Sequence, residues 1–79
     1  MINITKYKTT DLGVCAYLVV KFSILNLERL GTNKFAFIFE RTPELDKEVN
    51  AYFTNTAQIS PLEYFNNLRS LKTRIYSET

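Results

Sequence analysis

The sequence has no histidine, a single cysteine and only two glycines among its 79 residues. Without histidine, the chain lacks the commonest general base near neutral pH and the commonest zinc ligand. Cys15 has no second cysteine to pair with and supplies only one thiolate for a metal site. Two isolated glycines, Gly13 and Gly31, do not build a glycine-rich phosphate-binding loop. We therefore expect no catalytic residues, no cofactor and no metal, and predict that the protein is not an enzyme.

A long hydrophobic run is also missing. The run from Val14 to Val20 is far shorter than the roughly 20 apolar residues that a membrane span needs. We expect it to form a buried core element, with no membrane association. Cys15 lies within this run, so we expect a buried thiol in a reducing compartment, which indicates a cytoplasmic protein.

The first half of the chain has the pattern of a strand, a helix and a hairpin. Residues Ile2–Lys8 alternate loosely between apolar and polar types, which predicts a short strand. Thr10 or Asp11 can cap a helix that runs to about Phe22, although the valines of this segment also suit a strand. A connection containing Gly and Asn then joins two segments predicted to pair as antiparallel strands: Ile24–Leu30 and Phe35–Glu40.

The second half contains two clear helix starts. In Thr42-Pro43-Glu44 a capping hydroxyl precedes proline at the first helical position, which predicts a helix to about Asn55. In Ser60-Pro61-Leu62-Glu63 a capping serine is followed by glutamate three residues on, which predicts a last helix to about Tyr76. We therefore predict one α+β domain over residues 1–79, in the order strand, helix, strand, strand, helix, helix. Its three-stranded sheet should have the helices packed on one face.

Five segments of the chain carry a resemblance to known proteins: Tyr7-Lys8-Thr9-Thr10-Asp11-Leu12, Phe37-Ile38-Phe39-Glu40, Thr42-Pro43-Glu44-Leu45, Ala51-Tyr52-Phe53 and Leu68-Arg69-Ser70-Leu71-Lys72. Together they resemble a family of short bacterial and phage proteins that is recorded only as a domain of unknown function. The resemblance covers nearly the whole chain, from about Tyr7 to Ser77. It implies an intact single-domain protein and carries no activity, substrate or catalytic residue.

Acidic side chains are the remaining candidates for chemistry. Glu44, Asp46 and Glu48 cluster on one helix, where we expect them to form a solvated polar face. Glu28 and Glu40 lie on the two hairpin strands, where a pair of carboxylates could bind a divalent cation. We favour exposed positions for them beside neighbouring arginines.

Aromatic residues alternate along Phe35, Phe37 and Phe39, with Lys34 beside them. Alternating aromatic residues on the third strand of a strand-helix-strand-strand-helix order are typical of sheets that stack RNA bases. The glycine expected after the basic residue is absent, however, and the chain ends in a helix instead of a fourth strand. We therefore favour the interpretation that the three phenylalanines form the core face of the sheet.

Basic residues provide a second, weaker indication of nucleic-acid binding. The net charge is only +2, but the segment between Glu63 and Glu78 contains cations and no acid. A basic patch made by the first strand and the last helix would bind nucleic acid through Lys6, Lys8, Arg69, Lys72 and Arg74. The cations near the end of the helix also simply complement its dipole, and we favour that interpretation.

The last helix has a wide apolar arc that includes Phe65 and has Lys72 within it. A lysine there either extends its ammonium group to water or marks a contact with a partner. We predict an uncharacterised interaction module that binds a protein partner or a second copy as a homodimer. The candidate interface residues are Tyr64, Leu68, Leu71, Lys72, Ile75 and Tyr76. Weak nucleic-acid binding is the alternative function.

Overall fold

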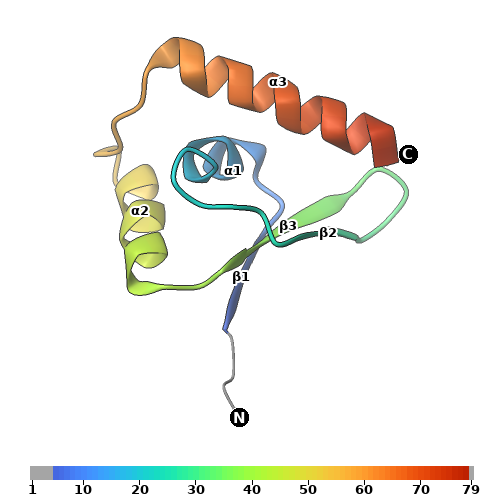
Figure 1. Ribbon diagram of the computed structural model, residues 1–79, viewed down its shortest axis with the longest axis horizontal. Helices are drawn as coiled ribbons and strands as arrows, with labels where there is room; N and C mark the ends of the chain where they lie inside the picture. Colours follow the sequence, from blue (N-terminus) through green and yellow to red (C-terminus); the bar gives the residue numbers. More distant parts are fainter. Residues whose placement is uncertain (1–4, 79) are drawn as a thin grey trace.

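A computed structural model describes residues 5–78 of the protein. The element order is β1 (Lys6–Thr9), α1 (Leu12–Leu18), β2 (Asn26–Arg29), β3 (Phe35–Glu40), α2 (Pro43–Phe53) and α3 (Pro61–Glu78) (Figure 1). The predicted α+β class and the predicted order of elements are confirmed. Ile2 and Ile4, which the predicted first strand includes, lie outside the described residues.

The sheet has the order β1-β3-β2, and both pairings are antiparallel. Phe37 lies opposite Thr9 on one side and Leu27 on the other, so this register places the phenylalanine row on one face of the sheet. The central position of β3 follows from its composition, because it is the strand whose residues suit burial on both faces. Sequence patterns alone left this strand order open.

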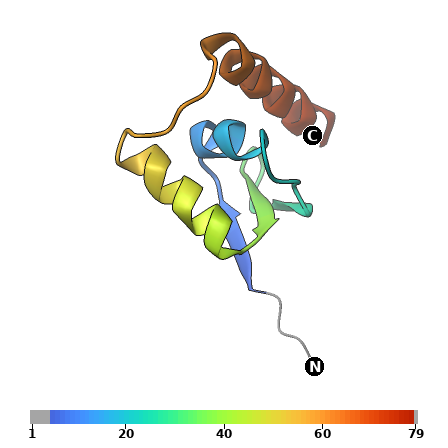
Figure 2. The same ribbon diagram turned by 60° about the vertical axis from the view of Figure 1, so that its left-hand side comes forward.

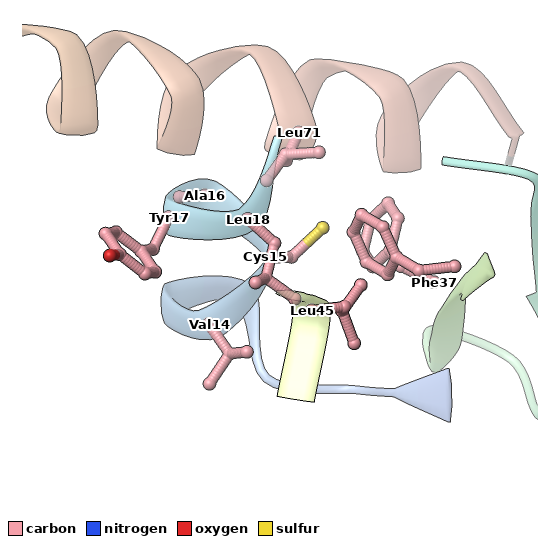
Figure 3. Packing of buried hydrophobic residues seen from close by; sticks show 9 residues of the cluster. Val14, Cys15, Ala16, Tyr17, Leu18, Phe37, Leu45 and Leu71 are labelled. Atoms are coloured by element: carbon pink, nitrogen blue, oxygen red, sulfur yellow. The ribbon is translucent and has the colours of Figure 1, made fainter. Parts of the chain in front are cut away.

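The phenylalanine row forms part of the hydrophobic core. Phe35 is 6% exposed, and Phe37 and Phe39 are 0% exposed. Figure 3 shows Phe37 beside Cys15 of α1 and Leu71 of α3. This confirms the core interpretation and excludes a base-stacking sheet, because stacking needs aromatic faces that nucleotides can reach.

Helix α1 packs against both other helices (Figures 1 and 2). Every residue from Val14 to Leu18 is buried, as the apolar run predicts. Burial raises the pKa of the Cys15 thiol to about 12, so this thiol stays protonated and unreactive at neutral pH. The helices cover the face of the sheet that carries Phe37 and Phe39.

The predicted end of α1 near Phe22 is wrong, because the helix ends at Leu18 and continues as a turn. The Lys21 N–H donates to the Leu18 carbonyl at 3.1 Å. This bond spans three residues and closes a tighter turn than the four-residue bond of an α-helix. Val20 and Lys21 are exposed, so the packing that buries residues 14–18 of α1 does not extend to them. Val19 and Val20 are also β-branched, and β-branched residues have a lower helix propensity than unbranched ones.

The predicted caps are in place at all three helices. Asp11, and not Thr10, caps α1, since its Oδ1 accepts from the Gly13 N–H at 2.8 Å. Thr42 Oγ1 accepts from the Leu45 N–H at 3.1 Å at the start of α2. Ser60 Oγ accepts from the N–H of residue 63 at 3.4 Å, and α3 begins at Pro61 as predicted. Local cap chemistry therefore sets where each helix starts.

Candidate interaction surface on the last helix

Helix α3 has a narrow buried side. Four side chains at helical spacing pack on the core: Tyr64, Leu68, Leu71 and Ile75. Leu71 is the buried residue among them, and Asn67 adds a hydrogen bond from its Nδ2 to the Ala16 carbonyl of α1 at 3.0 Å. These four residues were predicted as interface residues, and the structure places them against the protein's own interior. Leu71 is thus closed to a partner while α3 stays docked, whereas Tyr64, Leu68 and Ile75 are partly buried.

The other two predicted interface residues, Lys72 and Tyr76, are exposed. Together with Leu12, Asn33 and Ile75 they line an open groove of about 450 Å³. Lys72 lies within the apolar arc on a helical wheel, but the arc that α3 buries is narrower than the predicted one. The Lys72 side chain is therefore exposed because of how α3 is oriented, and its ammonium group does not have to extend past buried neighbours to reach water.

Large apolar side chains are exposed where α2 ends and α3 begins. Phe53 is 63% exposed, Leu62 68% and Phe65 57%, and we call these three residues the end patch. The Tyr52 and Tyr64 hydroxyl oxygens lie 3.4 Å apart, which holds the end of α2 beside the start of α3. Figure 1 shows both helix ends on the same side of the molecule. The end patch therefore consists of exposed apolar side chains on two helix ends that this hydroxyl pair links.

Gly13 makes the meeting of the three helices possible. A Cβ atom at Gly13 would lie 2.3 Å from the Tyr52 hydroxyl and 2.9 Å from the Tyr64 hydroxyl. The hydrogen bond with Tyr64, with burial added, raises the pKa of Tyr52 to about 12, so the Tyr52 hydroxyl is uncharged at neutral pH. Sequence reasoning missed this contact, although a glycine in the first turn of an otherwise apolar helix was a signal for it.

The five predicted nucleic-acid-binding residues do not form one patch. Lys8 lies opposite Ile38 in the sheet, so Lys8, and Lys6 two residues before it, point to the face away from Phe37. Arg69, Lys72 and Arg74 belong to α3, which packs on α1 on the helical side of the sheet. The structure thus separates the two strand lysines from the helix cations, because sheet alternation turns those lysines away from the helices.

The lysines of β1 take part in covering the open face of the sheet. Lys8 Nζ lies 3.1 Å from Glu28 Oε2 on β2. This ion pair reaches across β3, where the register places Ile38 and Ala36 beside the two residues. Glu28 therefore pairs with a lysine and not with Arg29 or Arg41, and Glu40 lies opposite Lys6. Among residues 5–78, no three potential metal-ligand side chains gather as a metal site would require.

The expected solvated acidic face is found for Glu44 and Asp46, which are exposed, but it is wrong for Glu48. Tyr17 of α1 donates its hydroxyl hydrogen bond to Glu48, and Lys21 Nζ lies 2.9 Å from Glu48 Oε2. The Tyr17 hydrogen bond, with the Lys21 contact second, lowers the pKa of the Glu48 carboxyl. The adjacent cavity of about 20 Å³ is too small for a substrate, so we interpret this contact as structural.

These elements define a class of protein: a small α+β domain whose antiparallel three-stranded sheet is covered on one face by helices. A model of the family "Domain of unknown function (DUF5659)" matches residues 5–77, so the chain belongs to that family. No curated protein and no solved structure matches the chain. Within residues 5–78, no helix has the length and apolar character to cross a membrane.

Proposed function

We propose that the protein is a non-catalytic, cytoplasmic interaction module that forms a homodimer through the end patch. The observation that carries this proposal is the exposure of three large apolar side chains on adjoining helix ends: Phe53, Leu62 and Phe65. Scattered single apolar residues are ordinary on a surface, but two phenylalanines and a leucine at one end are a typical mark of a contact site. The inert, buried Cys15 thiol supports a non-catalytic role in a reducing compartment.

A second copy fits the end patch because the patch carries no charge. In a two-fold symmetric contact, each surface meets an identical surface, so a charged centre would repel itself. The nearest cation on the helix, Arg69, has its guanidinium carbon 5.8 Å from the centre of the Phe65 ring. This places the charge beside the apolar centre, where interface rims are commonly polar.

The size of the chain also supports self-association. A domain of this length buries a smaller fraction of its surface than a larger one does, and its stability is correspondingly small. Burial of the end patch in a dimer would add apolar contact without a disulfide or a metal. Lys72 and Tyr76 remain candidates for the outer part of such a contact, since both are exposed on α3.

Light scattering over a range of protein concentrations tests the proposal. We expect a dimer whose fraction rises with concentration, and a monomer for the Leu62→Ser/Phe65→Ser double variant. Leu30→Ser is the matched control, because Leu30 is an exposed apolar residue of the hairpin that lies outside the end patch. A wild-type chain that stays monomeric at every concentration, or a dimer unaffected by the double variant, would overturn the proposal.

A further inference from the structure

The outward side of α3 has a stripe made only of hydrogen-bonding side chains: Asn66, Arg69, Ser70 and Thr73. The spacing of three, one and three residues places the four on one face of the helix. All four are exposed, and they line a shallow hollow of about 420 Å³. Figure 1 shows α3 at the margin of the molecule, with its outer side away from α1 and the sheet. We call these four residues the polar stripe.

The charge around the polar stripe is of one sign. From residue 64 to residue 77 the helix carries Arg69, Lys72 and Arg74 and no carboxylate. The ion pairs found within residues 5–78 use Lys8, Lys21 and Arg41, so none of them neutralises a cation of α3. The guanidinium of Arg69 contacts the Phe65 ring instead. An acid-free helix face with unneutralised cations is complementary to an anionic partner.

We propose that the polar stripe binds the phosphodiester backbone of nucleic acid. Arg69 would neutralise a phosphate, while Asn66, Ser70 and Thr73 would donate hydrogen bonds to phosphate oxygens. Lys72 lines the groove beside Leu12 and Asn33 and would add to the positive charge nearby. Phosphate and sugar contacts in nucleic-acid complexes come from these residue types. The inference goes beyond the proposed dimer because it names a different partner, although Arg69 borders the end patch through its contact with Phe65.

The composition of the stripe favours nucleic acid over an acidic protein. A protein that binds a helix in a groove needs apolar anchors at the spacing of three, four and seven residues. Between residues 66 and 73 that spacing gives Asn66, Arg69, Ser70 and Thr73, none of which is apolar, and the apolar Leu62 and Phe65 of the end patch lie one turn before them. Because Lys6 and Lys8 lie on another face, the contact involves few phosphates. The binding is therefore weak, sensitive to salt and independent of sequence.

Fluorescence anisotropy with short labelled strands tests the proposal, with single-stranded DNA, single-stranded RNA and duplex DNA as separate probes. We expect binding at low salt that weakens as salt rises, with a log–log slope of about −0.7 to −0.9 for each phosphate contacted. Arg69→Gln should weaken binding to every sequence alike and reduce the magnitude of the slope by about 1. Lys47→Gln is the control, since Lys47 is an exposed cation on α2.

The result that would overturn the proposal is absence of binding to all three probes at low salt. An equal loss of affinity in Lys47→Gln would also overturn it, because net charge and not the stripe would then explain binding. Polyglutamate that competes as well as nucleic acid at equal charge would reassign the surface to an acidic protein. Light scattering on the same proteins, Arg69→Gln included, measures dimerisation separately, so failure of one proposal is distinguishable from failure of the other.

Discussion

Helices α1 and α3 lie against each other but use their surfaces in opposite ways. In α1, all five residues from Val14 to Leu18 are buried, whereas Leu71 is the buried residue of the 18-residue α3. Helix α1 has little exposed surface for binding a partner, because it packs against the sheet, α2 and α3. The last helix contributes one narrow stripe to the core and leaves most of its circumference to solvent. Substitutions should therefore affect folding in α1 and binding in α3.

A pair of identical substitutions tests this comparison with the largest expected effect. Leu18 in α1 is 1% exposed and Leu62 in α3 is 68% exposed. Leu18→Ala should lower the free energy of unfolding by about 2–5 kcal/mol, because it removes buried contacts and leaves a cavity. Leu62→Ala should change the stability of the monomer by less than about 0.5 kcal/mol. Urea denaturation at low protein concentration measures both.

Equal losses in the two variants would contradict the contrast between a buried α1 and a largely exposed α3. An Ile24→Val variant gives an intermediate reference, since Ile24 packs against the core but is only partly buried. Its loss should fall between the two leucine variants. Low protein concentration keeps the proposed dimer from adding its own stabilisation to the measurement.

Features that depend on neighbours along the chain could be predicted from the sequence. The Ser60 cap, the proline starts of α2 and α3, and the buried row of Phe35, Phe37 and Phe39 all follow from local residue chemistry. Strand β3 matched its predicted bounds because its apolar run lies between a Gly- and Asn-containing connection and the Thr42 cap of the next helix. The same locality explains the resemblance, since the motifs that carry it include these caps and core positions.

Features that depend on how helices meet could not be predicted. The end of α1 at Leu18, the contact of Glu48 with Tyr17 and the close approach at Gly13 each require the placement of a second helix. The wheel for α3 gave a wide apolar arc, but the structure buries only part of it and leaves Phe65 outside. Four of the six predicted interface residues therefore pack on the core, and Lys72 and Tyr76 are exposed, so the predicted interface stays a prediction that these positions do not test.

Gly13 offers a second test, because here α1 depends on contact with both other helices. Gly13→Ala should destabilise the protein by about 1–2 kcal/mol, since overpacking outweighs the helix propensity gained with alanine. The added Cβ would lie too close to the Tyr52 hydroxyl, so the tyrosine ring or the helix that carries it would have to shift. Thermal denaturation measures the loss.

Removing the obstructing oxygen separates crowding from other effects at this position. In a Tyr52→Phe background, Gly13→Ala should cost less than it does in the wild type, because the methyl group gains the space of the hydroxyl. Such a difference is a coupling that independent sites do not show. A Gly13→Ala variant more stable than the wild type would show that α1 tolerates a side chain where the three helices meet.

The smallest expected effect concerns the polar contact between α1 and α2. Tyr17 donates a hydrogen bond to Glu48 and Lys21 forms an ion pair with it, and both interactions hold the pKa of Glu48 below its ordinary value. A carboxyl whose pKa is lowered by folding stabilises the protein above its unfolded pKa, and this contribution is lost as the pH falls through the folded value. The stability of the wild type should thus decrease below about pH 4.5 in part through Glu48.

Glu48→Gln should cost about 1 kcal/mol at neutral pH and make the decrease between about pH 5 and about pH 3 less steep. Glu78→Gln is the matched control, because it removes the same charge from an exposed position at the end of α3. Urea denaturation across this pH range measures the slope for each protein. If the two variants had the same pH dependence, the Tyr17–Glu48 contact would contribute nothing to stability. The polar link between α1 and α2 would then be as dispensable as the outer surface of α3 is for folding.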